Sequence, residues 1–156
     1  MNTSEQLFQA IRSADATGAV QLLEQHPTLI HARDARGATP LVLASYLDEL
    51  TIAEQLIAAG AGLNVKDGTG STPLMGVSFK GHVAVATYLL ERGAAVNIRG
   101  PRGFTALMFA VLGKHVEVAE LLLRSGADTT LVDEQGLTAA DHARQSGLTD
   151  MASLLE

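Results

Sequence analysis

The stretch Gly37-Ala38-Thr39-Pro40-Leu41 decides the fold, because it returns at a fixed spacing along the chain. With a 33-residue period it recurs as Gly70-Ser71-Thr72-Pro73-Leu74, as Gly103-Phe104-Thr105-Ala106-Leu107, and finally as Gly136-Leu137-Thr138-Ala139-Ala140. Alanines keep the same step at positions 53, 86, 119 and 152, and glycines do so at positions 60, 93 and 126. Several positional series with one period indicate a protein built from repeated units.

Each unit has the pattern of a turn followed by two short helices. Gly37 supplies the positive φ that a tight turn needs, Thr39 suits an N-cap, and Pro40 suits the first helical position. The apolar spacing predicts helices over 41–47 and 51–59, and the later units repeat this pattern. Gly60 stands where a helix stops on a left-handed residue. One unit buries too little apolar surface to fold alone, so stacking between units must stabilise the chain.

These motifs, each followed by a Gly-Ala pair at 60–61, 93–94 and 126–127, resemble the ankyrin repeat family. The resemblance implies an all-α solenoid of stacked helix-turn-helix units with β-hairpin-like turn fingers. The register divides one ankyrin repeat domain (1–156) into a capping unit (1–33), three internal repeats (34–66, 67–99 and 100–132) and a closing repeat (133–156). In the capping unit, Thr3 and Gln6 have the spacing of a capping box. Gly100-Pro101 replaces the Asp that opens the other turns, which predicts a differently shaped third finger.

Composition excludes several classes of protein. The chain has no Cys, which excludes disulfides, a thiol nucleophile and thiolate metal sites. Its formal charge of −6 argues against a general nucleic-acid binder. No apolar run reaches the length of a membrane span, and the N-terminus lacks a secretory signal, so we expect a cytoplasmic protein.

Catalytic and metal-binding patterns are missing from the sequence. It contains no phosphate-binding loop, nucleophile elbow or HExxH motif, so we predict no enzyme activity, no catalytic residues, no cofactor and no metal site. His82 and His115 are separated by one full period, and we therefore expect them to bridge helix-to-helix turns. Equal repeat lengths leave no inserted loop that would build a catalytic pocket.

The remaining candidate for function is the exposed surface. The family resemblance implies that a partner protein binds along the turn tips and the first helix of each unit. By the 33-residue register, these partner-binding positions are Arg33, Arg36, Tyr46, Leu47, Lys66, Thr69, Phe79, Lys80, Arg99, Arg102, Phe104 and Leu112. Arg together with aromatic side chains is typical of interface hot spots.

These positions hold six of the 11 Lys and Arg residues, which predicts a locally basic surface for a partner protein with an acidic patch. We expect a monomeric interaction module that acts as an inhibitor, an immunity-like or accessory protein of an enzyme, or an assembly adaptor. Two alternatives remain open at this point. In the first, the same basic surface binds a nucleic acid. In the second, these charges only keep the turns soluble. One of the aromatic residues could then also belong to the core and not to a binding surface.

Overall fold

Ten α-helices and two 3₁₀ helices make up the computed structural model, which describes all 156 residues and contains no β-strand. The chain divides into two compact units, unit 1 (Met1–Pro73) and unit 2 (Leu74–Glu156). Unit 1 contains α1 (Thr3–Arg12), α2 (Ala16–Gln25), η1 (Pro27–His31), α3 (Pro40–Tyr46) and α4 (Leu50–Ala58). The helix α5 (Pro73–Lys80) begins on the last residue of unit 1. Unit 2 continues with α6 (Val83–Glu91), η2 (Pro101–Gly103), α7 (Ala106–Leu112), α8 (Val116–Arg124), α9 (Ala139–Gln145) and α10 (Thr149–Leu154). This confirms the all-α prediction.

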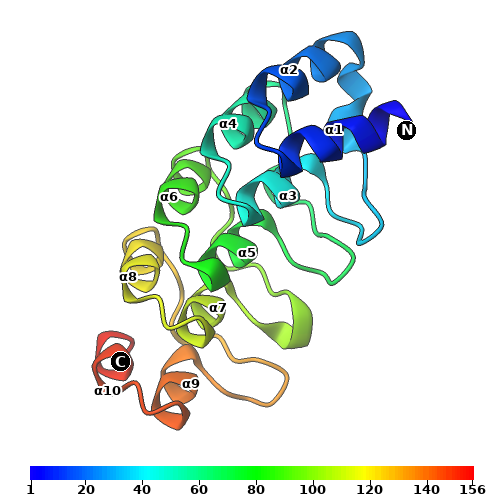
Figure 1. The fold of residues 1–156 in the computed structure, drawn as a ribbon. Helices are drawn as coiled ribbons and strands as arrows, with labels where there is room; N and C mark the ends of the chain where they lie inside the picture. Colours follow the sequence, from blue (N-terminus) through cyan, green and yellow to red (C-terminus); the bar gives the residue numbers. More distant parts are fainter. The chain divides into compact units, whose positions relative to one another are not determined.

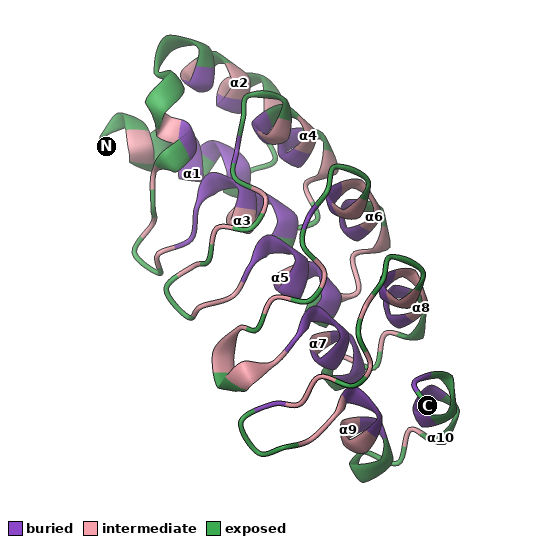
Figure 2. Cartoon of the chain, turned by 180° about the vertical axis from the view of Figure 1, so that it is seen from behind, coloured by how far each residue is buried: buried purple, intermediate pink, exposed green.

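In each unit, consecutive helices form antiparallel pairs, and neighbouring pairs stack (Figure 1). In unit 1, the inner helices α1 and α3 pack on each other and on their outer partners α2 and α4. In unit 2, α7 packs on α9 and α6 packs on α8 in the same manner. Figure 2 shows that the buried residues of each unit lie on the helix sides that face these neighbours.

The predicted caps explain where the inner helices begin. The hydroxyl oxygen of Thr39 accepts a hydrogen bond from the Val42 N–H (3.2 Å), and Pro40 follows as the first helical residue. Thr105 and Thr138 cap α7 and α9 in the same way. The observed helices α3 and α4 begin one residue earlier than the ranges 41–47 and 51–59 that the pattern predicts. The outer helices stop at glycines with positive φ, as expected, at positions 60, 93 and 126.

The capping box of α1 differs from the prediction. Asn2, not Thr3, is the N-cap: its side-chain oxygen accepts the Glu5 N–H (2.8 Å), and the Glu5 carboxylate accepts the Asn2 N–H (3.0 Å). The prediction of Thr3 and Gln6 was wrong by one residue. An anionic Glu in the first helical turn is favoured by the positive end of the helix dipole, and a neutral Gln is not.

Small and medium-sized side chains fill the core. In unit 1, Leu7, Ile11, Leu41 and Ile52 are almost completely buried between the helix pairs. Unit 2 buries Leu89, Leu107, Leu122 and two methionines, Met75 and Met108, which follow the threonines at positions 72 and 105 by three residues. The methionines thus fill the core at equivalent places in two successive copies of the motif.

Four loops, which we call fingers, lead from an outer helix to the next inner helix: residues 32–39, 65–72, 98–105 and 131–138. An Asp carboxylate organises three of them; in finger 1, Asp34 Oδ1 accepts the N–H groups of Arg36 and Ala38. In finger 3, Gly100-Pro101 opens a short 3₁₀ turn instead, with φ = 58° at Arg102. The prediction of a different third finger is confirmed.

Within each unit, a backbone-to-backbone hydrogen bond joins two neighbouring finger tips. The Gly68 N–H donates to the Arg36 carbonyl (3.1 Å) in unit 1, and the Glu134 N–H donates to the Arg102 carbonyl (3.0 Å) in unit 2. The fingers of unit 1 approach so closely that a Cβ on Gly37 would lie 2.8 Å from the Gly68 nitrogen. Glycine is therefore required at this tip, both for space and for its φ of +75°.

Candidate functional site

A groove of about 440 Å³ runs between the fingers and α3 of unit 1. Its apolar wall consists of Ala38, Val42 and Leu43, and the exposed side chains of Tyr46 and Leu47 extend it at the last turn of α3. Polar residues complete the lining: Arg12, Asp34, Arg36, Asp67 and Thr69. Of the predicted partner-binding residues, the structure thus brings together Arg36, Tyr46, Leu47 and Thr69.

The carboxylates of this groove are engaged in its own framework. Asp34 Oδ2 accepts a hydrogen bond from the Arg12 guanidinium (3.2 Å), while its other oxygen holds finger 1. Asp67 Oδ1 accepts the backbone N–H groups of Thr69 and Ser71 and the Thr69 hydroxyl. By contrast, the guanidinium of Arg36 makes no hydrogen bond or ion pair. The groove therefore offers one uncommitted cation above an apolar wall.

Arg33 and Lys66, two other predicted residues, do not line this groove. The Arg33 guanidinium donates hydrogen bonds to the carbonyls of Gly37 (2.7 Å) and Lys66 (2.8 Å), so it fastens finger 1 to finger 2. It lines a smaller hollow of about 100 Å³ together with Ile30 and His31. Although Arg33 and Arg36 lie close together in the sequence, they therefore serve different sides of the finger.

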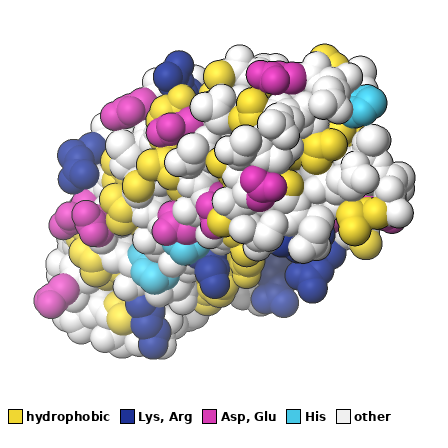
Figure 3. All heavy atoms as spheres, turned by 45° about the horizontal axis from the view of Figure 1, so that its top comes forward, with side chains coloured by type: hydrophobic (Ala, Val, Ile, Leu, Met, Phe, Trp, Pro, Cys, Tyr) yellow, Lys and Arg dark blue, Asp and Glu magenta, His cyan; other side chains and the backbone are white.

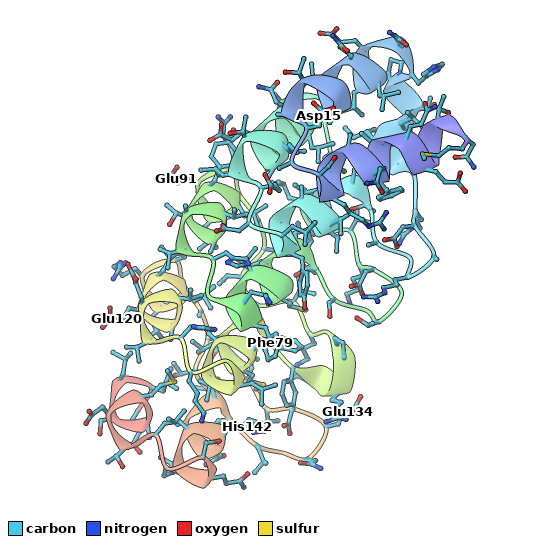
Figure 4. All side chains as sticks on the ribbon, in the orientation of Figure 1. Asp15, Phe79, Glu91, Glu120, Glu134 and His142 are labelled. Carbon is cyan, nitrogen blue, oxygen red and sulfur yellow. The ribbon has the colours of Figure 1, made fainter.

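In unit 2, two large apolar side chains are exposed at the last turns of inner helices. Phe79, which Figure 4 labels near the end of α5, is 41% exposed, and Leu112, at the end of α7, is 53% exposed. Lys80 is exposed beside Phe79. Glu91 and Glu120 project from the outer helices α6 and α8, away from the fingers, as Figure 4 shows. The inner helix ends of unit 2 therefore present Phe79, Leu112 and Lys80, and these two glutamates lie on the opposite side of the unit.

The remaining predicted residues lie on a finger of unit 2. Arg99 and Arg102 are exposed, and the Arg102 guanidinium makes no hydrogen bond or ion pair. Phe104 is only half-exposed, because its ring packs against Phe109 (centroids 5.5 Å apart) and against the His142 imidazole (5.0 Å). Of the three aromatic residues predicted at the surface, Tyr46 and Phe79 are exposed, whereas Phe104 is not.

Hydrogen bonds lower the pKa of three carboxyls in unit 2. Burial raises the pKa of Asp133, but hydrogen bonds from Leu137, the His142 ring (2.6 Å) and Gln135 outweigh it and hold this pKa below its ordinary value. The Thr130 hydroxyl and backbone N–H lower the pKa of Asp128. The Thr138 N–H, with Arg144 adding to it, lowers the pKa of Asp141 to about 2. All three serve turns or caps, so we assign them structural roles.

The surroundings of His115 also indicate a structural role and not a catalytic one. His115 lies directly over two glycines: a Cβ on Gly81 would lie 2.5 Å from its Nδ1, and a Cβ on Gly113 would lie 2.6 Å from its Cδ2. The prediction that His115 bridges helix-to-helix turns is thereby confirmed within unit 2. No three His, Asp or Glu side chains lie close enough together to hold a metal ion.

Comparison with known families explains this architecture. Residues 7–100 match a family model described as ankyrin repeats in three copies, and residues 89–143 match one described as ankyrin repeats in many copies. The chain belongs to the ankyrin repeat family. Ankyrin repeats typically mediate protein–protein interaction and are typically non-catalytic. No curated protein has a sequence significantly similar to that of this ankyrin repeat chain. No helix in it combines the length and apolar character that crossing a membrane requires.

Six residues that line the unit 1 groove were not among the predicted partner-binding positions, namely Arg12, Asp34, Ala38, Val42, Leu43 and Asp67. Arg12 lies on α1, ahead of the first copy of the 33-residue motif, so the register did not assign it a partner-binding position. A usable signal was the shared position of Arg12 and Tyr46, each the last residue of an inner helix. Val42 and Leu43 look like ordinary core residues in the sequence, but both are only half-buried.

Proposed function

We propose that this ankyrin repeat protein binds a partner protein without catalysing a reaction, through its fingers and the exposed ends of its inner helices. The observation that carries the proposal is the groove of unit 1, which the uncommitted Arg36 and the exposed Tyr46 and Leu47 line together. Arg and aromatic side chains are the residue types that dominate binding energy at protein interfaces. Bound in this way, the protein acts by occupying, masking or positioning its partner.

The fingers of unit 2 support the same assignment. Arg102 occupies the finger position that Arg36 occupies two repeats earlier in unit 1, and its guanidinium is also uncommitted. Phe79 and Leu112 supply exposed apolar surface in the same unit. Each unit therefore combines a finger arginine with exposed apolar side chains, and a partner with an acidic surface patch complements both.

The net charge of −6 favours a protein partner over a nucleic acid. Figure 3 shows Lys and Arg side chains interspersed with many separate Asp and Glu side chains on the face it draws. Such a surface repels a polyanion at long range, whereas a single acidic patch still pairs with individual arginines at contact distance. Binding to a nucleic acid would instead require many cations at phosphates.

Affinity capture from the native lysate with charge-reversal variants tests the proposal. We expect Arg36→Glu and Arg102→Glu, singly and together, to weaken capture of the partner while the circular dichroism spectrum and the melting temperature stay unchanged. Exposed charges contribute little to stability, which is why the fold should persist. Arg124→Glu, an exposed arginine in the last turn of the outer helix α8, is the matched control. Equal capture by all variants would show that the fingers are not the binding face.

A salt titration with a single-stranded oligonucleotide tests the competing partner class. We expect no binding at low salt. Binding that weakens steeply with salt and is lost in Arg36→Glu would assign the same surface to a nucleic acid instead.

A further inference from the structure

The groove of unit 1 is large enough for one or two large side chains of a partner. It is too small to take in the surface of a folded domain. Its volume of about 440 Å³ lies in the range of small-ligand pockets. Val42 and Leu43 form its wall, and Tyr46 and Leu47, 43% and 39% exposed, form its open edge. An apolar side chain of a partner would remove water from all four of these residues at once.

The positive and negative side chains that line this groove are equal in number, but not all of them are available to pair with a charge on a partner. Asp34 and Asp67 already accept hydrogen bonds from their own fingers, and Arg12 pairs with Asp34 at 3.2 Å. Only the Arg36 guanidinium is uncommitted, and its backbone is held in place because its carbonyl accepts the Gly68 N–H. The groove can thus pair with one additional anion without breaking an existing contact.

We propose that this groove takes an extended segment of a partner protein in which a leucine-sized or aromatic residue lies next to a residue with a carboxylate. The apolar side chain packs on Val42, Leu43 and Tyr46, and the carboxylate pairs with Arg36. This inference rests on the proposed function and narrows it to one anchor site and one partner chemistry. A carboxylate fits better than a phosphate, because a dianion would meet the nearby carboxylates of Asp34 and Asp67.

Blocked dipeptides provide the test, read by amide chemical shifts of the ¹⁵N-labelled full chain. The three probes are acetyl-Leu-Glu-amide, the isosteric but uncharged acetyl-Leu-Gln-amide, and acetyl-Gly-Glu-amide, which lacks the apolar side chain. We expect acetyl-Leu-Glu-amide to bind about three- to tenfold more tightly than either of the others, with shifts centred on finger 1 and α3. In Arg36→Gln, acetyl-Leu-Glu-amide should bind no better than acetyl-Leu-Gln-amide, while Arg102→Gln should behave like the unmodified chain.

Several results would overturn the assignment. One is an equal affinity of the chain for the Glu and Gln peptides, and another is an equal loss of affinity for acetyl-Leu-Glu-amide in Arg36→Gln and Arg102→Gln. The assignment would also fail if the chemical-shift changes centred outside the groove, or if no probe gave a saturable change. If acetyl-Leu-phosphoserine-amide binds more tightly than acetyl-Leu-Glu-amide, the anion that the groove prefers is a phosphate and not a carboxylate. Shifts of the groove amides that depend on protein concentration alone would assign the groove to a second copy of the chain.

Comparing partner capture with dipeptide binding separates the role of the groove from that of the fingers as a whole. If charge reversal at Arg36 and Arg102 abolishes partner capture but no dipeptide binds, the fingers are the binding face and the anchor assignment is wrong. If acetyl-Leu-Glu-amide binds through Arg36 but charge reversal leaves capture unchanged, the groove recognises this chemistry and the captured partner uses another face.

Discussion

Replacing Gly81 by Ala tests how the helix-to-helix turns of unit 2 are built. Gly81 has φ = +79°, and its turn lies under the imidazole of His115, whose Nδ1 is 2.5 Å from the place of an added Cβ. Gly147 occupies the equivalent position two repeats later, with φ = +72°, but nothing lies within 4 Å of its added Cβ. The two glycines therefore share one backbone conformation and differ in the space around it.

The structure gives different magnitudes for the two substitutions. For Gly147→Ala, only the left-handed backbone matters, and we expect the free energy of unfolding to fall by about 1–2 kcal/mol. Gly81→Ala adds the displacement of the His115 ring, and overpacking of this kind costs about 1–3 kcal/mol more. We therefore expect Gly81→Ala to lower the free energy of unfolding by about 2–4 kcal/mol in total.

Urea unfolding followed by circular dichroism measures both values, and a double-mutant cycle with His115→Ala isolates the steric part. Without the ring, Gly81→Ala should cost no more than Gly147→Ala, which gives a coupling energy of about 1–3 kcal/mol. If Gly81→Ala and Gly147→Ala are equally destabilising in the presence of His115, the imidazole does not occupy the space over Gly81, and the reasoning fails.

Three further predictions concern packing, the fingers and pH. Ala86, completely buried on α6, should not tolerate Leu: we expect Ala86→Leu to lower the free energy of unfolding by about 1–3 kcal/mol, and an unchanged melting temperature would contradict its burial. Gly68→Ala should destabilise unit 1 by about 1 kcal/mol, because the Cβ overlaps the Arg36 carbonyl and breaks their hydrogen bond, whereas Glu134→Ala at the equivalent place should be nearly neutral in the same urea assay. The pKa of Asp141 is lowered to about 2 from 3.8, so this carboxylate stabilises the fold fully above pH 3.8 and loses its contribution as the pH falls toward 2. Asp141→Asn should therefore flatten the pH dependence of the free energy of unfolding between these pH values. An equally steep pH dependence in the variant would refute the assignment.

The repeat and its caps were predictable from the sequence because they depend on local chemistry. Thr39 followed by Pro40 indicates a helix start in any context, and Gly60 indicates a helix stop. The capping box of α1 shows the limit of this reasoning, because Asn2 and Thr3 are both good N-caps with a partner three residues on. Only the charge of Glu5 distinguishes them.

The candidate site was predictable only in part, because the direction of a side chain depends on its surroundings. Residue type did not reveal that Arg33 turns toward finger 2 while Arg36 lines the groove. The packing of Phe104 on His142 was equally hidden, since it arises between residues of different repeats. The register identified which positions are exposed, but the structure is needed to say which of them lie together.

The hydrogen bonds between neighbouring finger tips, from Gly68 to Arg36 and from Glu134 to Arg102, have a consequence for recognition. Long loops ordinarily sample many conformations, and a ligand that selects one of them loses affinity through the lost freedom. Here folding itself restricts the tip backbone, so only side-chain rotamers remain to be fixed at the moment of contact. Under the proposed function, the partner would therefore meet finger tips whose backbone is already held in one conformation.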